Sequence, residues 1–425
     1  MTGSAGRFSA LLPPVVRAVR RGWWPAALAL AALLATACSP AGDTRGAPGA
    51  APPATASGRT PQPPGTPPET TRSAPAHAGH GSPAKPPRSA PLRAGEEFRT
   101  LQPARAYTPR PPSGGTDDYR CFLVDPGLRD RMFLTGTRFT PQNTGIVHHA
   151  IFFRLGPEQV APARALDAGT PQEGWTCFGD AGLGGATWVA HWAPGTGEAL
   201  LDPAYGHELP AGSALVMQVH YNTLGAGGRP VGADRSGIRL RLSGEALRPL
   251  RTDLLTAPVE LPCTARESGP LCDREAALAD VARRFGPRSL GMVDYLNRLC
   301  SDGGPPRAGA VQRCDHAVYR PATVHALAGH MHLLGRSIRI ELNPGTPRAR
   351  TLLDVPSYDF DDQSARILDR PARIGPGDTL RVTCTHDAGL RAMLPQLSGT
   401  PPRHVVWGEG TSDEMCLGVV IASDP

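Results

Sequence analysis

Apolar and polar residues alternate along several short stretches from about residue 98 to the end of the chain. These stretches are rich in Val, Ile, Leu, Phe and Thr, and clusters of Gly, Pro and Asp separate them. A period of two is typical of half-buried antiparallel strands, so the pattern predicts an all-β protein built from β-sandwiches. The clearest stretches are GIVHHAIFFRL (145–155), SALVMQVHYNT (213–223), SGIRLRLS (236–243), SIRIELN (337–343), DTLRVTCTH (378–386) and MCLGVVIAS (415–423).

One segment departs from this alternation. DREAALADVARRFG (273–286) has helical spacing and strong helix-forming residues, and it lies within a cysteine-rich segment at 263–314. We expect this segment to be a helical insertion held by its own disulfides. Because 425 residues exceed one ordinary core, we predict two consecutive sandwich domains at 98–257 and 258–425, with the insertion in the second.

The first 97 residues have a different composition. Arg17, Arg20 and Arg21 precede the short apolar run PAALALAALLATA, which ends at Cys38. This order resembles a bacterial lipoprotein signal over residues 1–38, with Cys38 as the lipidated first residue of the mature chain. Ordinary signal-peptidase cleavage and a retained hydrophobic anchor remain alternatives.

A Pro-, Ala- and Gly-rich stretch at 39–97 follows, with almost no bulky apolar residues. It cannot bury enough surface to offset chain entropy, so we predict a disordered tether. His77 and His80 within it are expected to be incidental. Each alternative for the N-terminus places the rest of the protein outside the cytoplasm, and a lipid on Cys38 would hold it at the outer face of the bacterial cell membrane.

The number of cysteines and the distribution of charge indicate the compartment of the protein and exclude one class of partner. Removing Cys38 from the nine cysteines leaves eight, an even number that favours disulfides in an oxidising compartment. The net charge of +6 comes almost entirely from scattered arginines, with no basic stripe and no interleaved aromatic residues. No nucleic-acid partner is therefore expected.

The stretch GHMHLLG (329–335) contains the first candidate metal ligands. His330 and His332 are two residues apart, and on a strand both rings would face the same side and could share a metal ion. Such a pair alone is weak evidence, because surface or packing histidines have the same spacing.

Three further stretches change that assessment. TGIVHHAIFFR places His148 and His149 in an otherwise apolar strand, and VMQVHYNT places His220 in another. Buried imidazoles are costly unless their nitrogens are satisfied. In WGEGTSDEMCLGVV, Met415 follows a Gly-rich turn and opens a strand. Together with HMHLLG, these stretches resemble the copper type II, ascorbate-dependent monooxygenases, the family of the peptidylglycine- and dopamine-hydroxylating enzymes, over about residues 117–425.

The resemblance implies two copper ions per chain and a pair of jelly-roll-like β-sandwich domains. In that family three histidines of the first domain bind one copper, and the motif match assigns this role to His148, His149 and His220. Two histidines and a methionine bind the second, oxygen-activating copper, which would be the catalytic centre formed by His330, His332 and Met415.

The resemblance also implies one disulfide. In that family the cysteine after the methionine ligand pairs with a cysteine on a preceding strand, which here are Cys416 and Cys384. We add Cys121 with Cys177 as a second expected pair. Cys263, Cys272, Cys300 and Cys314 are assigned to the insertion with their connectivity open.

The residue types support copper independently of the family. A thioether is a soft, uncharged ligand that favours Cu(I), and two imidazoles with one thioether leave an open position for dioxygen. Zinc prefers Cys, His or carboxylate ligands. His148 and His149 point to opposite faces of an ideal strand, so joint ligation requires a twist, a bulge or different ring nitrogens. Without the motif match, Met415 would be read as a core residue.

These observations predict a secreted or lipid-anchored monooxygenase that hydroxylates a C–H bond of a small molecule with dioxygen and an external reductant such as ascorbate. The protein is expected to hold the two copper sites apart, dry and oriented. Two alternatives are a non-catalytic copper-binding lipoprotein for storage or delivery and an electron-transfer copper protein, which usually needs a cysteine thiolate.

Three positions depart from the family pattern. Ala150 follows the histidine pair where animal members carry methionine, and Val419 replaces a tyrosine. Ala328 stands where peptide-amidating members have an arginine that grips the peptide carboxylate, and alanine cannot supply that contact. We discount the other histidines: His325 is expected to be a packing group or to support a ligand, and the rest are expected in turns or polar contexts, namely His191, His207, His316, His386 and His404.

Overall fold

The structure is a computed structural model that describes residues 89–194, 196–224 and 230–425. All of them belong to one compact unit, Thr71–Pro425. The predictions for the signal segment, the Cys38 lipid anchor, His77 and His80 lie outside the described residues. Strands are the main regular structure of the described residues, with 41% in strands and 15% in helices, as the alternating pattern predicts, and all six quoted stretches form strands.

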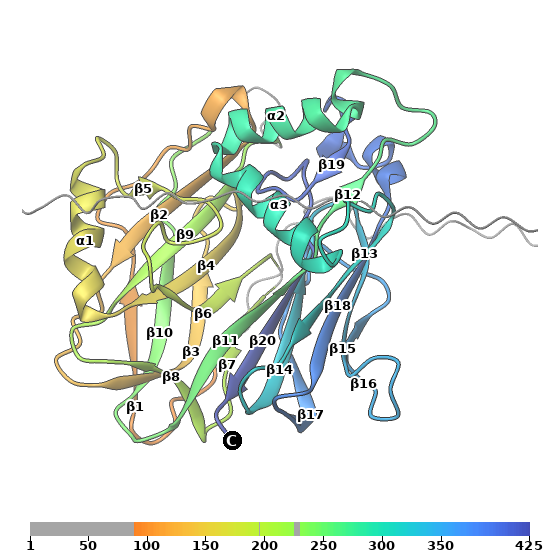
Figure 1. The fold of residues 1–425 in the computed structure, drawn as a ribbon. Helices are drawn as coiled ribbons and strands as arrows, with labels where there is room; N and C mark the ends of the chain where they lie inside the picture. Colours follow the sequence, from red (N-terminus) through yellow and green to blue (C-terminus); the bar gives the residue numbers. More distant parts are fainter. Residues whose placement is uncertain (1–88, 195, 225–229) are drawn as a thin grey trace, which may run out of the picture. The chain divides into compact units, whose positions relative to one another are not determined.

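The N-terminal half packs two sheets face to face around one apolar core (Figure 1). Phe152 from one sheet and Leu240 from the other are fully buried in this core. One sheet contains β5 (Trp175–Thr176), β2 (Asp117–Val124), β9 (Ala214–Asn222), β4 (Val147–Leu155) and β6 (Thr187–Trp192). The facing strands are β1 (Glu96–Leu101), β10 (Gly237–Ser243), β3 (Met132–Thr140), β8 (Tyr205–Leu209) and the short β7 (Ala199–Leu200).

The C-terminal half repeats this arrangement around a second core. Val382 and Val420 lie in it from opposite sheets. One sheet contains β13 (Val311–Ala317), β18 (Thr379–His386), β15 (Gly335–Leu342) and β16 (Arg350–Val355). The facing strands are β11 (Arg248–Thr256), β20 (Leu417–Ser423), β14 (Ala322–His330) and β17 (Arg366–Ile374). A small two-stranded sheet pairs β12 (Glu260–Leu261) with β19 (Val405–Val406).

One sheet is continuous through both halves. β11 pairs with β8 over two residues in parallel and with β20 over seven residues in antiparallel register. The boundary predicted near residue 257 falls immediately after β11, so this strand precedes the boundary in sequence yet contributes Leu255 to the C-terminal core. The division into two separate domains stays a prediction.

Four disulfides are present. The predicted pairs Cys384–Cys416 and Cys121–Cys177 are confirmed. The four cysteines whose pairing was left open form the disulfides Cys263–Cys272 and Cys300–Cys314. Cys314 lies in β13, so the last residues of the expected insertion belong to a sheet and the Cys300–Cys314 bond ties the helices to that sheet.

The expected helix is α2 (Arg274–Phe285), which Asp273 caps by accepting a hydrogen bond from the Ala276 amide. A second helix of the insertion is α3 (Arg288–Cys300). A helix that was not predicted from the sequence, α1 (Pro157–Ala168), packs on the outer face of the N-terminal sheet. Its signal was the proline at the first helical position, a favoured start for a helix.

Residues 89–97 were predicted to belong to the disordered tether, and the structure shows them packed on the fold. Arg241 is 1% exposed and donates hydrogen bonds to the carbonyls of Ala90 and Pro91 and to the Glu96 carboxylate. A buried guanidinium needs several acceptors, and this stretch supplies them. Residues 89–97 are therefore part of the fold. Among the described residues, no helix has the length and apolar character needed to cross a bilayer.

Glu260 joins the insertion to the C-terminal half. Its carboxylate is 1% exposed and contacts Arg274 Nη2 at 2.6 Å, Asn297 Nδ2 at 2.8 Å and His404 Nε2 at 3.0 Å. Burial alone would raise the pKa of Glu260, but the hydrogen bonds from Arg274 and His404 and the Arg274 charge outweigh it and lower the pKa to about 2.

We predict that Glu260→Gln destabilises the protein by about 3 kcal/mol at pH 7, because its partners hold the pKa of Glu260 at about 2 instead of 4.5. A lowered carboxyl pKa contributes stability above its unfolded value, here 4.5, and that contribution disappears as the pH falls toward about 2. Urea unfolding of parent and variant should therefore differ at pH 7 and converge between pH 4.5 and 2. Glu275→Gln is the matched control, because Glu275 contacts the same Arg274 but is 79% exposed. An equal effect of the two substitutions would contradict the prediction.

Candidate metal centre and adjoining cavity

Three histidine rings meet in the N-terminal half. His148 and His149 lie on β4 and His220 lies on the neighbouring β9. The three Nδ1 atoms are 3.0 Å (His148 to His149), 3.1 Å (His148 to His220) and 3.4 Å (His149 to His220) apart. The register of β4 against β9 shifts between Val147 and His149. This bulge turns His148 toward its neighbour, as joint ligation requires.

The surroundings of the three rings orient them. The Nε2 atom of His220 lies 3.0 Å from Asp117 Oδ1, so Nε2 carries the proton and the Nδ1 lone pair faces the other rings. Asp117 also accepts hydrogen bonds from the amide and hydroxyl of Thr411 in the C-terminal half. Burial alone would raise the pKa of Asp117, but the hydrogen bonds and charge of His220 and the bonds from Thr411 hold it well below its usual range.

Burial also sets the charge of the cluster. It lowers the pKa of His148 and of His149 well below the usual value, and the neighbouring histidines lower each further. His220 stacks on Tyr119 with ring centroids 4.1 Å apart. His148 Nε2 is buried with no hydrogen-bond partner. Neutral imidazoles with converging lone pairs are the form that a metal ion binds.

The second pair of histidines lies at a strand end. His330 is the last residue of β14, whereas His332 lies in the connection to β15. The expectation that both rings project from one strand is therefore wrong, although the rings remain neighbours with centroids 5.2 Å apart. Because the connection between β14 and β15 does not follow the alternation of a strand, His332 can turn inward there, and it is only 1% exposed.

Hydrogen bonds fix the tautomers of this pair. Gln363 donates its Nε2 to the Phe360 carbonyl, so its Oε1 accepts from His330 Nδ1 at 2.5 Å. His332 Nδ1 donates to the Asp413 carbonyl at 3.2 Å. In both rings Nε2 therefore holds the lone pair, and that of His332 is buried without a partner. Burial, followed by the effect of His332, lowers the pKa of His330 to about 3.

Glu414 connects this pair to Met415. Its buried carboxylate accepts the backbone amides of His332, Leu334 and Met415. Glu414, the residue before Met415, thus binds the backbone of the segment that carries His332. Glu414 was not among the site residues predicted from the sequence, where its only signal is an acidic residue between a Gly-rich turn and an apolar strand.

The glycines of the WGEGTSDEM turn allow this arrangement. A Cβ atom on Gly408 would lie 2.8 Å from Asp413 Cβ, and one on Gly410 would lie 2.6 Å from an Arg284 nitrogen. Arg284 of α2 is bound to Asp413 at 2.6 Å. The insertion therefore supports the turn that presents Met415.

The two donor sets lie next to each other. The ring centroids of His149 and His330 are 5.5 Å apart, which differs from the expectation that the protein holds the two sites apart. The loop 356–365 between β16 and β17 contacts both sets. Its Phe360 stacks on His148 at 4.4 Å between centroids, and its Gln363 binds His330.

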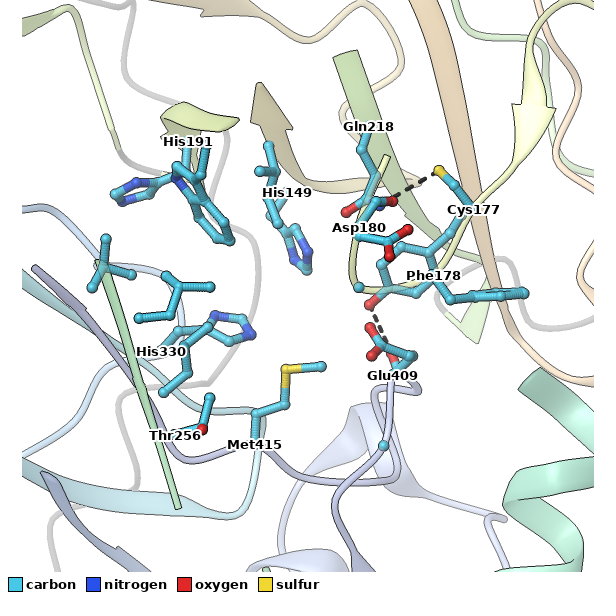
Figure 2. A pocket seen from close by; sticks show the side chains of 18 of the residues that line it. His149, Cys177, Phe178, Asp180, His191, Gln218, Thr256, His330, Glu409 and Met415 are labelled. Atoms are coloured by element: carbon cyan, nitrogen blue, oxygen red, sulfur yellow. Dashed lines mark hydrogen bonds between the residues drawn. The ribbon is translucent and has the colours of Figure 1, made fainter. Parts of the chain in front are cut away.

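Both sets border one cavity of about 440 Å³. His149, His330 and Met415 point into it from different elements, as Figure 2 shows. Aromatic and other apolar side chains form most of the wall, among them Phe178, Trp188, Trp192, Phe285, Met292 and Trp407. A concave, mainly apolar cavity with a few polar groups is the usual form of a small-molecule site.

The three positions that depart from the family pattern, Ala150, Ala328 and Val419, all line this cavity. Their short apolar side chains place no charge on the wall. The only lysine or arginine among the lining residues is the exposed Arg288 at the start of α3.

Glu409 is a lining residue that the sequence reading missed. Within the described residues, no hydrogen bond or ion pair reaches its carboxyl group; its backbone carbonyl accepts from the Tyr119 hydroxyl at 2.7 Å. Burial raises the pKa of Glu409 to about 8, and Asp413 and Asp180 add to the shift.

Some discounted histidines have structural roles. His191 lies in β6 rather than in a turn, lines the cavity and contacts the Gln363 carbonyl at 3.3 Å. His207, His316 and His386 also lie in strands, namely β8, β13 and β18. His404 lies outside a strand and binds Glu260. His325 contacts Ser423 Oγ at 2.9 Å, which agrees with a packing role.

The donors fit copper. Three imidazole nitrogens suit several divalent metals, whereas two imidazoles with a thioether favour Cu(I). The three-histidine cluster satisfies the geometry of a metal site with all its residues buried. The buried and unpartnered nitrogen of His332 is the kind of atom that a metal ion would satisfy.

Comparisons with known proteins identify no family. No protein-family model and no curated protein matches the chain. Solved structures that match include the major capsid protein P2 of bacteriophage PM2 (9% identity, 77% of this chain and 97% of that chain, TM-score 0.25) and an allantoicase (9%, 78% and 90%, 0.17). Another is the VP2 subviral particle of infectious bursal disease virus (10%, 80% and 74%, 0.16). TM-scores this low carry no argument about fold or function.

Proposed function

We propose that this protein is a copper-dependent monooxygenase that hydroxylates a C–H bond of a small molecule. The observation that carries the proposal is that two donor sets, one of three imidazoles and one of two imidazoles with a thioether, border a single apolar cavity of about 440 Å³. The residues quoted for the family resemblance account for all six donors.

The two sets would have different roles. His148, His149 and His220 would hold a copper ion that receives electrons from a reductant such as ascorbate. His330, His332 and Met415 would hold a second ion beside the substrate. When bound, copper would supply one-electron redox chemistry and the activation of dioxygen. One oxygen atom would enter the C–H bond, and the other would leave as water with two electrons from the reductant and two protons.

The protein's own groups would prepare the site. Asp117 and Gln363 fix the tautomers of His220 and His330, so that each presents a lone pair. Glu414 fixes the spacing between the His332 backbone and the Met415 backbone. Trp188 and Trp407 would exclude water from the substrate.

Two observations bear on the alternatives. An electron-transfer copper site usually has a cysteine thiolate, and Cys416, the cysteine beside Met415, is in a disulfide. A storage or delivery protein needs no substrate cavity, and the cavity beside the donors therefore favours an enzyme. Oxygen uptake coupled to oxidation of an added reductant distinguishes the enzyme from both.

We also propose that the protein works outside the cytoplasm. Four disulfides support an oxidising compartment. Attachment to the outer face of the cell membrane through a lipid on Cys38 remains part of the proposal.

We predict that Met415→Ile preserves folding and removes one of two tight Cu(I) sites. Isoleucine keeps the apolar bulk and removes the sulfur, so the preference for Cu(I) should fall at that centre. Copper analysis of the reduced protein should give about one ion instead of two, and turnover should fall by orders of magnitude. Replacing His220 should remove the other ion and impair electron supply. Two tightly bound Cu(I) ions and full activity in Met415→Ile would show that the thioether is not a ligand.

We predict that glycine-extended peptides are poor substrates. Ala328 lines the cavity and offers no charge to a peptide carboxylate. Loss of one charge-assisted pair is worth about 1.5 to 3 kcal/mol, or roughly ten- to hundredfold in affinity. An amidation assay with a peptidylglycine should show no turnover at micromolar substrate. Efficient amidation at that concentration would mean that the substrate site lies elsewhere.

A further inference from the structure

A second cavity lies on the N-terminal half, and its lining is basic. It has a volume of about 560 Å³ and is formed by β1, β10 and β3 and the segments next to them. Figure 1 shows these three strands side by side. The described residues that line it include Arg138, Arg235 and Arg239 and no aspartate or glutamate. None of them lines the cavity beside the candidate metal centre.

The register of the sheet places two of these arginines face to face. Arg239 of β10 is directly opposite Arg138 of β3. Both side chains point away from the apolar core, because Ile238 and Leu240, the neighbours of Arg239 in β10, are fully buried in that core. Like charges directly opposite each other on a sheet are destabilising. The arrangement therefore costs stability unless a negatively charged acceptor lies between the two side chains.

The same face of the sheet supplies such acceptors to another arginine. Arg241, two residues along β10 from Arg239, forms ion pairs with Glu96 at 2.7 Å and with Glu198 at 3.3 Å. Among the described residues, no ion pair reaches any of the three arginines that line the cavity. The fold thus neutralises one end of this basic face and leaves the other end without a counter-charge.

Two of the guanidinium groups converge on one neutral oxygen. Arg138 donates its Nη1 to the Ser89 hydroxyl at 3.1 Å, and Arg239 donates its Nη2 to the same oxygen. The Nε atom of Arg239 is buried without a partner among the described residues. Since a guanidinium carries five N–H donors, one hydroxyl satisfies only a small part of the two groups. Arg239 also lies over the Phe98 ring at 4.4 Å, which holds its plane in place.

We propose that this cavity is a binding site for a phosphate group, held by Arg138, Arg235 and Arg239. A planar guanidinium bonds two phosphate oxygens at once, and a phosphate with two negative charges can bridge several guanidinium groups. A monocarboxylate offers only one charge and two oxygens. The amides of Gln102 and Gln142 also line the cavity and could bond the remainder of a phosphate ester. The site goes beyond the proposed monooxygenase function and does not depend on it.

Calorimetric titration of the full-length, copper-free protein with inorganic phosphate tests the proposal. The ionic strength is kept constant, so that screening of surface charges does not change during the titration. Phosphate should bind saturably with a dissociation constant of about 1 mM or lower. Acetate should bind at least about tenfold more weakly. Absence of phosphate binding, or equal binding of acetate, would overturn the proposal.

Arg138→Gln tests the assigned residues. It removes one guanidinium and should weaken phosphate binding roughly ten- to hundredfold. Arg373→Gln is the matched control, because Arg373 is an exposed arginine on β17 outside the cavity lining, and this variant should bind phosphate like the parent. Undiminished binding in a folded Arg138→Gln protein, or an equal loss in the control, would overturn the proposal. The comparison of phosphate with acetate on the parent decides it even if Arg138→Gln fails to fold.

The phosphate group could belong to a soluble compound or to a lipid headgroup, and a second titration distinguishes these sources. Phosphate binding is measured with phosphatidylglycerol vesicles and with phosphatidylcholine vesicles present. Suppression by phosphatidylglycerol alone would identify a lipid headgroup, and unchanged binding with both would identify a soluble phosphate compound. Either result supports the phosphate site. Because copper and reductant are absent, failure of the monooxygenase proposal would leave a positive result intact.

Discussion

The central constraint on this structure is the cost of burying imidazole nitrogens. His148, His149, His220 and His332 are all nearly inaccessible to solvent, and each ring nitrogen needs a donor, an acceptor or a metal ion. Asp117 and the Asp413 carbonyl satisfy one nitrogen of His220 and one of His332. The remaining nitrogens converge on one another or have no partner. The site therefore carries a cost that a bound metal ion would offset.

The two halves of the chain meet this constraint together. Asp117 belongs to the N-terminal half, yet the backbone and hydroxyl that complete its hydrogen bonds come from Thr411. Phe360 from the C-terminal half stacks on His148. The Gly-rich turn thus supports one donor set through Thr411 and the other through Glu414. A substitution in this turn can affect both sets, although only Met415 is a candidate ligand.

The features that could be predicted from the sequence are those that depend on local periodicity or on the chemistry of metal ligands. Alternation identified the strands, and the donors assigned to each centre came from the motifs around them. His332 was misplaced because two residues at HxH spacing look the same within a strand and at its end. Glu409 was missed and His191 was discounted because both matter through the cavity that they line, which elements distant in sequence create. Glu414 was missed for a related reason, since its partners are backbone amides that carry no residue signature.

X-ray absorption spectroscopy of the protein reconstituted with Cu(I) tests the central claim most directly, since sulfur and nitrogen ligands scatter differently. Cys416, the residue after Met415, is in a disulfide and offers no thiolate, so the Met415 thioether is the sulfur ligand that our account assigns to copper. Our account predicts two copper ions per chain, with a sulfur contribution corresponding to one ligand on one of them, and loss of that contribution in Met415→Ile. A spectrum with only nitrogen and oxygen ligands in the parent protein, or one unchanged by Met415→Ile, would contradict it.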